Sequence, residues 1–199
     1  MILNYDTRDS WTNPHVGFLN DLSLIKYGGV LGSKADFWTL TMDVRRYQPV
    51  WGRHRLALFT LATLQTGTVG IDVPVYRDFS LGGTNTIRGW RLDSRHGKHQ
   101  SISTVEYRYE VLPNKSFQIK GVTLFAGVQL AVFADAGSAW STGTDFARNY
   151  IGSGGVALRF KLPFVDMIRI DLASGQRGEG LMFHFGLHDK PIDQRRRVR

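Results

Sequence analysis

The sequence contains no cysteine, which excludes a disulfide framework, a zinc–thiolate site and a thiol nucleophile. It also lacks any apolar run close to the roughly 20 residues that a membrane-spanning helix needs. The longest apolar stretches, at residues 56–64 and 124–134, are interrupted and too short. A helical membrane protein is therefore excluded, whereas a membrane barrel built from strands is not. No secretory signal peptide is visible ahead of residues 4–9.

The sequence also carries no recognisable catalytic or metal-binding motif. Its histidines are not spaced as metal ligands, and neither a G-x-S-x-G nucleophile elbow nor a phosphate-binding P-loop is present. Glu106, Glu110 and Asp135 could form an acid/base set in an outer-membrane hydrolase, but charge pairing with Arg88 and Arg108 explains them better. We therefore expect a protein that is not an enzyme and that binds no cofactor and no metal.

Glycine and aromatic residues are plentiful by contrast. The chain of 199 residues has 22 glycines, against an average usage of roughly 7%. It also has 12 Phe, 7 Tyr and 5 Trp. This composition suits many strands with tight turns and aromatic girdles, and the length suits one domain of ordinary size.

The net charge of +8 is unevenly spread, because residues 190–199 supply five basic groups and one acid. We expect residues 189–199 to form a basic tail, either a solvated end or a segment that touches anionic lipid or nucleic acid. Elsewhere the charges alternate with apolar residues along expected strands. No nucleic-acid partner is expected for residues 1–188.

Alternation of apolar and polar residues dominates the chain and predicts β-strands, while helix signals are nearly absent. Residues 36–48 are the clearest case, since Trp38, Leu40 and Met42 share one face and Thr39 and Asp43 the other. Residues 55–67 are apolar on both faces, which indicates a strand covered on both sides. The expected strands are residues 2–8, 16–27, 36–48, 55–67, 102–112, 121–135, 154–162, 168–172 and 181–187.

The lengths of the strands and of their connections favour a membrane barrel. Most strands have about 9–13 residues, which fits a tilted strand crossing a bilayer. Short turns on one side and long loops on the other are typical of outer-membrane barrels. A soluble β-sandwich would also alternate, but the apolar faces here carry large side chains without polar interruption. The short connections are residues 49–54, 113–120 and 163–166, and the longer ones are residues 28–35, 67–101, 136–151 and 174–180.

The long central connection contains the stretch around which the chain is organised. Residues 81–91 read LGGTNTIRGWR. Gly82, Gly83 and Gly89 allow backbone conformations that other residues avoid, and between them Ile87 and Arg88 offer an apolar anchor and a charged group with five donors. We expect this loop to fold back and to insert Arg88 into the body of the protein.

Three motifs in sequence order resemble those of the Omp85 superfamily (bacterial surface antigen D15). The loop residues Ile87, Arg88, Gly89 and Trp90 look like its (V/I)-R-G-(F/Y) signature in the sixth extracellular loop. The sequence FADAG at 133–137 looks like its F-x-D-x-G strand motif. Residues 5–9, YDTRD, followed by Pro14 and Gly17, are similar to the strand-turn-strand segment upstream of these.

The resemblance implies a specific pairing inside the barrel. In that family the loop arginine reaches into the lumen and pairs with acidic residues of neighbouring strands. Arg88 is then the arginine, Asp135 the motif aspartate and Glu106 the second acid, with Gly82, Gly83 and Gly137 as motif glycines. Glu106 and Asp135 both fall on polar faces of their strands, in agreement with this assignment.

The fold class implied is an all-β, transmembrane, antiparallel up-and-down barrel of about eight strands per chain. Barrels of the family have sixteen strands, so residues 1–188 correspond to the carboxy-terminal half of a barrel with a long loop folded into its lumen. The chain is then a fragment, a naturally short member or one half of an oligomeric barrel. We expect two chains to pair edge to edge as a homodimer, or one chain to pair with a partner half-barrel, because exposed edges favour aggregation. A closed eight-stranded barrel of one chain has an interior too small for the loop.

The resemblance also implies a bacterial outer-membrane location, with outer-membrane lipid around the barrel. The first hypothesis for function is insertion or translocation of polypeptides or lipids, with unfolded outer-membrane proteins as substrates. The second is a membrane anchor or pore of a larger protein whose catalytic or POTRA part is elsewhere. A small enzyme or ligand-binding barrel is the third.

Overall fold

A computed structural model describes residues 1–10, 13–29, 32, 34–119, 122–162, 165–176 and 180–187. Of residues 114, 117, 119, 122–125, 165 and 166 it describes the backbone alone. The expected basic tail at 189–199, together with His188, lies outside these described residues.

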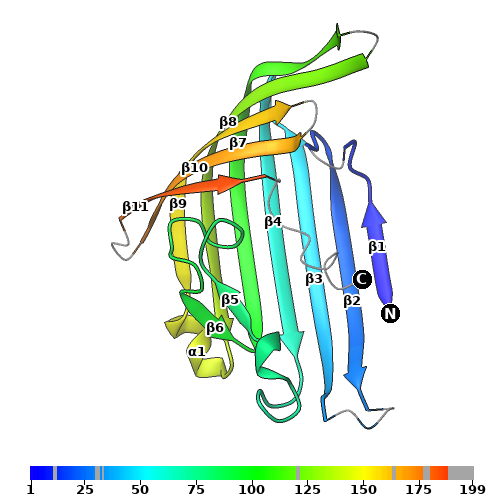
Figure 1. The fold of residues 1–199 in the computed structure, drawn as a ribbon, viewed down its shortest axis with the longest axis vertical. Helices are drawn as coiled ribbons and strands as arrows, with labels where there is room; N and C mark the ends of the chain where they lie inside the picture. The colour runs from blue at the N-terminus through cyan, green and yellow to red at the C-terminus, as the bar shows by residue number, and fades with distance from the viewer. Residues whose placement is uncertain are drawn as a thin grey trace.

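One nine-stranded antiparallel sheet forms most of the described chain (Figure 1). Its strands follow one another in sequence order, each antiparallel to the next, so the topology is up-and-down. The strands are β1 (Ile2–Asp6), β2 (Gly17–Gly28), β3 (Asp36–Pro49), β4 (His54–Gln65), β7 (His99–Ile119), β8 (Val122–Trp140), β9 (Ile151–Leu162), β10 (Val165–Gly175) and β11 (Leu181–Gly186).

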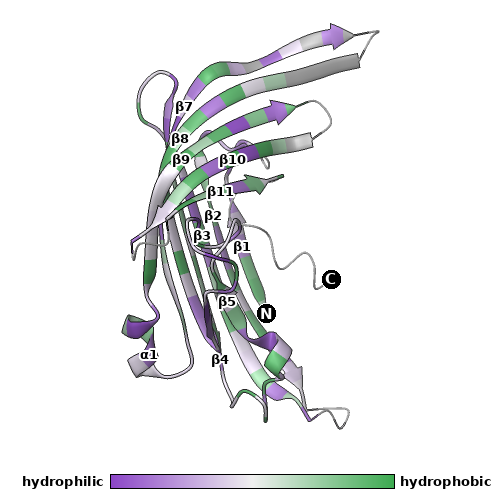
Figure 2. Cartoon of the chain, turned by 60° about the vertical axis from the view of Figure 1, so that its left-hand side comes forward, coloured by the Kyte–Doolittle hydropathy of each residue, from purple (hydrophilic) through white to green (hydrophobic). Residues whose placement is uncertain are grey.

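The sheet is curved, and hydrophilic and hydrophobic residues alternate along its strands (Figure 2). Its two faces therefore differ, as the alternation predicts. On β3, Trp38 and Met42 point to the convex face and are 43% and 42% exposed, whereas Phe37 and Asp43 point to the concave face and are buried. Polar and charged side chains, with some aromatic ones, therefore line the inside, and apolar side chains cover the outside. This is the reverse of a soluble sandwich core and is the pattern of an outer-membrane barrel wall.

The barrel is open, because the edge strands β1 and β11 do not pair with each other. The sheet is therefore half of a barrel, with the expected number of strands.

Strands β7 and β8 differ from the sequence prediction. The expected turn at residues 113–120 is wrong, since β7 continues to Ile119 and pairs with β8 as far as Ile119 opposite Val122. The ladder shifts register between Glu110 and Leu112 and again between Leu112 and Lys115. Pro113 lies at this irregularity, where its missing N–H is tolerated, and so proline marks a bulge rather than a turn. The hairpin projects beyond the neighbouring strands (Figure 1).

The connections between β4 and β7 and between β8 and β9 contain short elements that the alternation did not predict. Residues 66–98 include the 3₁₀ turn η1 (Val75–Arg77) and the small ladder of β5 (Phe79–Leu81) with β6 (Arg95–Gly97). Helix α1 (Gly143–Arg148) follows β8. At its start the hydroxyl and the backbone N–H of Thr142 donate to the Asp145 carboxylate and lower its pKa. No helix among the described residues is long and apolar enough to cross a membrane.

Candidate functional site: an arginine inside the curved sheet

The loop of residues 81–91 is shaped by its glycines and by Thr86. Gly82, Gly83 and Gly89 all have positive φ, at 119°, 90° and 79°, a region that side chains disfavour. The Thr86 hydroxyl donates to the Gly82 carbonyl at 2.9 Å and accepts from the Gly82 N–H at 2.8 Å. This closed turn holds Arg88 at the end of the loop that faces the sheet.

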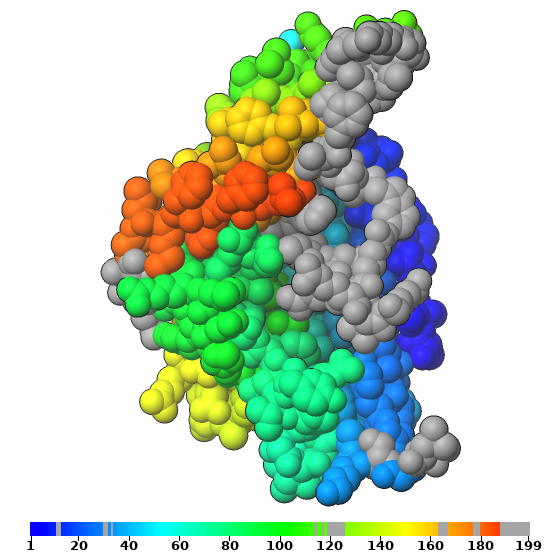
Figure 3. All heavy atoms as spheres, in the orientation of Figure 1, coloured from blue at the N-terminus to red at the C-terminus, as the bar shows by residue number. Residues whose placement is uncertain are grey.

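Ile87 and Trp90 anchor the loop on the concave face of the sheet. Both are fully buried and belong to one apolar cluster with residues of the flanking strands. The Trp90 Nε1–H donates to the Gly152 carbonyl at 2.9 Å, where β9 begins. Figure 3 shows the loop, in green, packed beside β11, in orange. The other members of the cluster are Leu81, Ile102, Ala139 and Ile151.

Arg88 is fully buried and is bound by three carboxylates from three strands. Its Nε and Nη2 donate to the two oxygens of Asp135 on β8, at 2.8 and 2.9 Å, in a bidentate pair. Its Nη2 also lies 2.9 Å from Glu106 Oε1 on β7, and its Nη1 lies 3.3 Å from Asp171 Oδ1 on β10. The backbone N–H of Arg88 donates to Asp135 as well, at 3.1 Å.

Further arginines surround the acids that hold Arg88. Arg108 and Arg159 both donate to Glu106 Oε2, at 2.8 and 2.6 Å. Arg169 donates through Nε to Asp171 at 2.6 Å and through Nη2 to the carbonyl of Thr84 in the loop, at 2.9 Å. Charges of both signs on β7, β8 and β10 therefore hold the loop, and Arg159 on β9 supports it through Glu106.

This buried network contains four arginines and three carboxylates, all at most 2% exposed. Removing such groups from water costs free energy, and the ion pairs offset this desolvation cost only while every partner is present. The Arg88 guanidinium also lies over the Phe133 ring, 3.2 Å from its centroid, a cation–π contact strengthened by the absence of water. The network therefore fixes one position for the loop, because a displaced Arg88 would leave three buried acids poorly paired.

His184 extends the attachment to the last strand of the sheet. Its Nε2 accepts a hydrogen bond from the Gly89 N–H at 2.9 Å, so the neutral ring carries its proton on Nδ1, 3.2 Å from the Thr84 hydroxyl. Strands β7, β8, β10 and β11 thus each contribute a polar side chain that contacts the loop, and β9 contributes the backbone carbonyl of Gly152.

Two glycines allow the loop and the strands to approach closely. At Gly89 a Cβ would lie 2.8 Å from the Ser174 carbonyl carbon on β10. At Gly137, the last residue of the F-x-D-x-G motif, it would lie 2.4 Å from the Ser101 carbonyl oxygen and 3.2 Å from Ile87 Cδ1. The motif glycine therefore makes room both for the neighbouring strand and for the loop anchor.

The structure brings together Arg88, Asp135 and Glu106, which the sequence singled out. It adds Asp171, Arg159, Arg169 and His184, whose only signal was their inward position in alternating strands. The pairing expected for Glu110 is different: Glu110 lies 3.1 Å from Arg55 and 3.0 Å from His15, near the short turns. Within the described part of the chain no group of acidic and histidine residues could hold a metal ion.

Comparison with known protein families gave one match over nearly the whole chain. A family model described as the Omp85 superfamily domain matches residues 2–188. A search of curated proteins found no match.

Comparison with solved structures gave the same fold. The crystal structure of BamA from Haemophilus ducreyi lacking POTRA domains 1–3 is similar with a TM-score of 0.73 and 19% sequence identity. The match covers 92% of this chain and 40% of that chain, so the present chain spans less than half of that BamA chain.

Proposed function

Since the chain belongs to the Omp85 superfamily and has the fold of part of a BamA barrel, we propose that it inserts or translocates polypeptides, or lipids, at the bacterial outer membrane. The observation that carries this proposal is the loop of residues 81–91, bound through Arg88 to the inside of the barrel wall. A wall with a fixed internal plug and open edges can guide a chain along its lumen or its edge.

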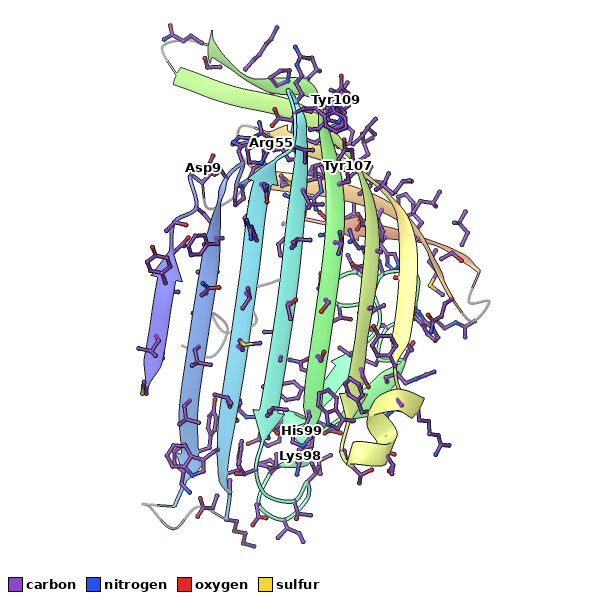
Figure 4. The ribbon with its side chains drawn as sticks, turned by 180° about the vertical axis from the view of Figure 1, so that it is seen from behind. Asp9, Arg55, Lys98, His99, Tyr107 and Tyr109 are labelled. Carbon is purple, nitrogen blue, oxygen red and sulfur yellow. The ribbon has the colours of Figure 1, made fainter. Side chains whose placement is uncertain are left out.

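The outer face of the sheet supports a place in the membrane. Apolar side chains cover it, and Trp51, His54, Tyr107 and Tyr109 form an aromatic group. Tyr107 and Tyr109 lie at the end of the sheet that carries the short turns (Figure 4). The Tyr107 hydroxyl and His54 Nδ1 are 2.9 Å apart. Such amphipathic rings prefer the boundary between lipid tails and headgroups. We propose outer-membrane lipid as the surroundings of this face.

The proposed substrates are unfolded outer-membrane proteins. An edge strand presents a row of backbone N–H and C=O groups that can pair with a strand of another chain. β11 is such an edge strand, and it lies next to the loop of residues 81–91. Contact between β11 and the loop through His184 ties the position of this edge to the charge network.

An insertion assay tests this function directly. The protein is reconstituted into lipid vesicles, an unfolded outer-membrane barrel is added, and its folding is followed by heat-modifiability on gels. We expect faster folding than in empty vesicles, with the gain lost in Arg88→Ala and kept in Arg91→Ala, an exposed arginine of the same loop. Equal folding rates with and without the protein would contradict the proposal.

A second candidate is a membrane anchor or pore for a larger protein. It is favoured by one observation, that the chain spans 40% of the BamA chain it resembles. In that case vesicles would conduct ions without any acceleration of folding, and the reading frame upstream of Met1 would encode a further domain.

A further inference from the structure

The two edges of the sheet run in the same direction. Nine strands follow one another, each antiparallel to its neighbour, so the first strand, β1, and the ninth, β11, are parallel to each other. A second copy related by a two-fold axis along the barrel would bring β11 against the partner's β1. Both seams of that barrel would then be parallel, whereas outer-membrane barrels of bacteria are antiparallel throughout.

Strand β2 does not have this problem, since it runs opposite to β11. Without β1, each chain would offer the eight strands from β2 to β11. Two such sets would close a sixteen-stranded barrel with two antiparallel seams, and each seam would be made by the same pair of strands, as two-fold symmetry requires.

Among the strands of the sheet whose side chains are all described, β1 is the least buried. It has five residues, and all of them are exposed. Ile2, which points to the concave face beside Ser23, is 57% exposed. Its ladder covers only Leu19–Ser23 of the twelve-residue β2. Backbone hydrogen bonds, one side-chain hydrogen bond from Asn4 to Asp21 and the ring contact of Tyr5 with Phe18 therefore attach β1 to β2, with little burial of its own residues.

If β2 paired with β11 of a second copy in place of β1, the side chains on each face of the two strands would have the same polarity. Outward-facing Leu22 and Leu24 on β2 are apolar and exposed, as are Phe183 and Phe185 on β11. Inward-facing Ser23 and His184 are polar and buried. Pairing β2 with β11 would thus continue the apolar outer face and the polar inner face without interruption.

We propose that β1 is a removable edge strand, which leaves β2 when β2 pairs with β11 of a second copy of this chain. The proposal rests on the membrane barrel of the proposed function and names its partner. The hinge would lie at Asp9, just after β1, whose carboxylate accepts from the backbone N–H groups of His15 and Val16, at 2.8 and 3.2 Å.

Engineered cysteines test this proposal cleanly, since the chain has none of its own. Leu3 and Leu22 are register partners on β1 and β2, at a separation that a disulfide can span. The double variant Leu3→Cys/Leu22→Cys would lock β1 in place when oxidised. The matched control, Leu24→Cys/Leu40→Cys, joins register partners on β2 and β3 and leaves the edge unchanged.

The measurement is the mass of the protein in detergent, with and without reductant. We expect dimers for the unmodified chain and for the oxidised control, and monomers for the oxidised Leu3/Leu22 variant that become dimers on reduction. A dimer that persists when β1 is locked would overturn the displacement of β1. An unmodified chain that stays monomeric, or that forms larger assemblies, would overturn pairing of two copies, while the insertion assay would still report on the function separately.

Discussion

At the scale of single residues, Arg88 uses its whole guanidinium group. Nε, Nη1 and Nη2 each face a carboxylate, and the face of the group lies on Phe133. A lysine has one compact ammonium and cannot copy this planar fork. Because the surrounding acids are buried, the loss of Arg88 leaves charges that water cannot reach.

Arg88→Ala is therefore expected to lower the free energy of unfolding by about 3–5 kcal/mol, as for other buried pairs that lose one partner. Arg88→Lys should recover a part of this loss, and Arg91→Ala should change it little, because Arg91 is exposed. Unfolding by urea in lipid vesicles measures these differences, and protease cleavage within residues 81–91 reports release of the loop. Equal stability and equal cleavage of Arg88→Ala and Arg91→Ala would contradict the role of Arg88.

The two aspartates that contact Arg88 should differ in their effect. Asp135 accepts from three nitrogens of Arg88 and from the Thr104 hydroxyl at 2.8 Å, whereas Asp171 faces one nitrogen of Arg88. We expect Asp135→Asn to destabilise by about 3–5 kcal/mol and Asp171→Asn by about 1.5–3 kcal/mol. The same urea titrations compare them, and a larger effect at Asp171 would show that Arg169 rather than Arg88 dominates the network.

Sequence reasoning found the centre of this network but not its outer part. The signature around Arg88 and the motif around Asp135 named their own residues, and alternation placed Glu106 on the polar face. Arg159, Asp171 and His184 belong to no motif, and alternation tells only that they face inward. The curvature of the sheet and the path of the loop backbone decide which strands the loop crosses, and therefore which of these residues it contacts. A local sequence pattern predicts neither.

At the scale of elements, the loop and the strands fit because glycines stand where backbones approach. Gly137 on β8 is one example, since a Cβ there would lie 2.4 Å from the Ser101 carbonyl oxygen on β7 and 3.2 Å from Ile87 Cδ1 in the loop. Within the F-x-D-x-G motif, the glycine is thus required for steric reasons and Asp135 for electrostatic reasons.

Gly137→Ala should therefore separate β8 from β7 or push Ile87 out of its cluster. An overpacked site commonly loses about 1–3 kcal/mol, and we expect a lower unfolding temperature on heat-modifiability gels. Gly143→Ala is the control, because a Cβ at Gly143 in α1 would meet no atom within 4 Å. The same unfolding temperature for both variants would argue against close packing at Gly137.

The strands themselves were largely readable from alternation, as β3 shows. Their ends were not: β7 begins before Ile102 and continues past Pro113, because pairing with β8 satisfies the backbone there and a bulge accommodates the proline. Helix α1 was missed because it has only six residues, too few to show a helical period.

At the scale of the whole molecule, the charge network and the apolar surface lie on opposite faces of the same sheet. The outer face suits lipid, the inner face holds the loop, and the open edges require further strands, which a second copy is proposed to supply. The loop would then block a lumen lined by both copies, and its position would depend on Arg88.

Ion conductance across a planar lipid bilayer tests the central claim, that Arg88 holds the loop inside a membrane barrel. The unmodified protein and Arg91→Ala should insert and conduct weakly, because the loop blocks the lumen. Arg88→Ala should insert and open to several times that conductance. The same low conductance in all three proteins, or a high conductance in all three, would contradict the claim.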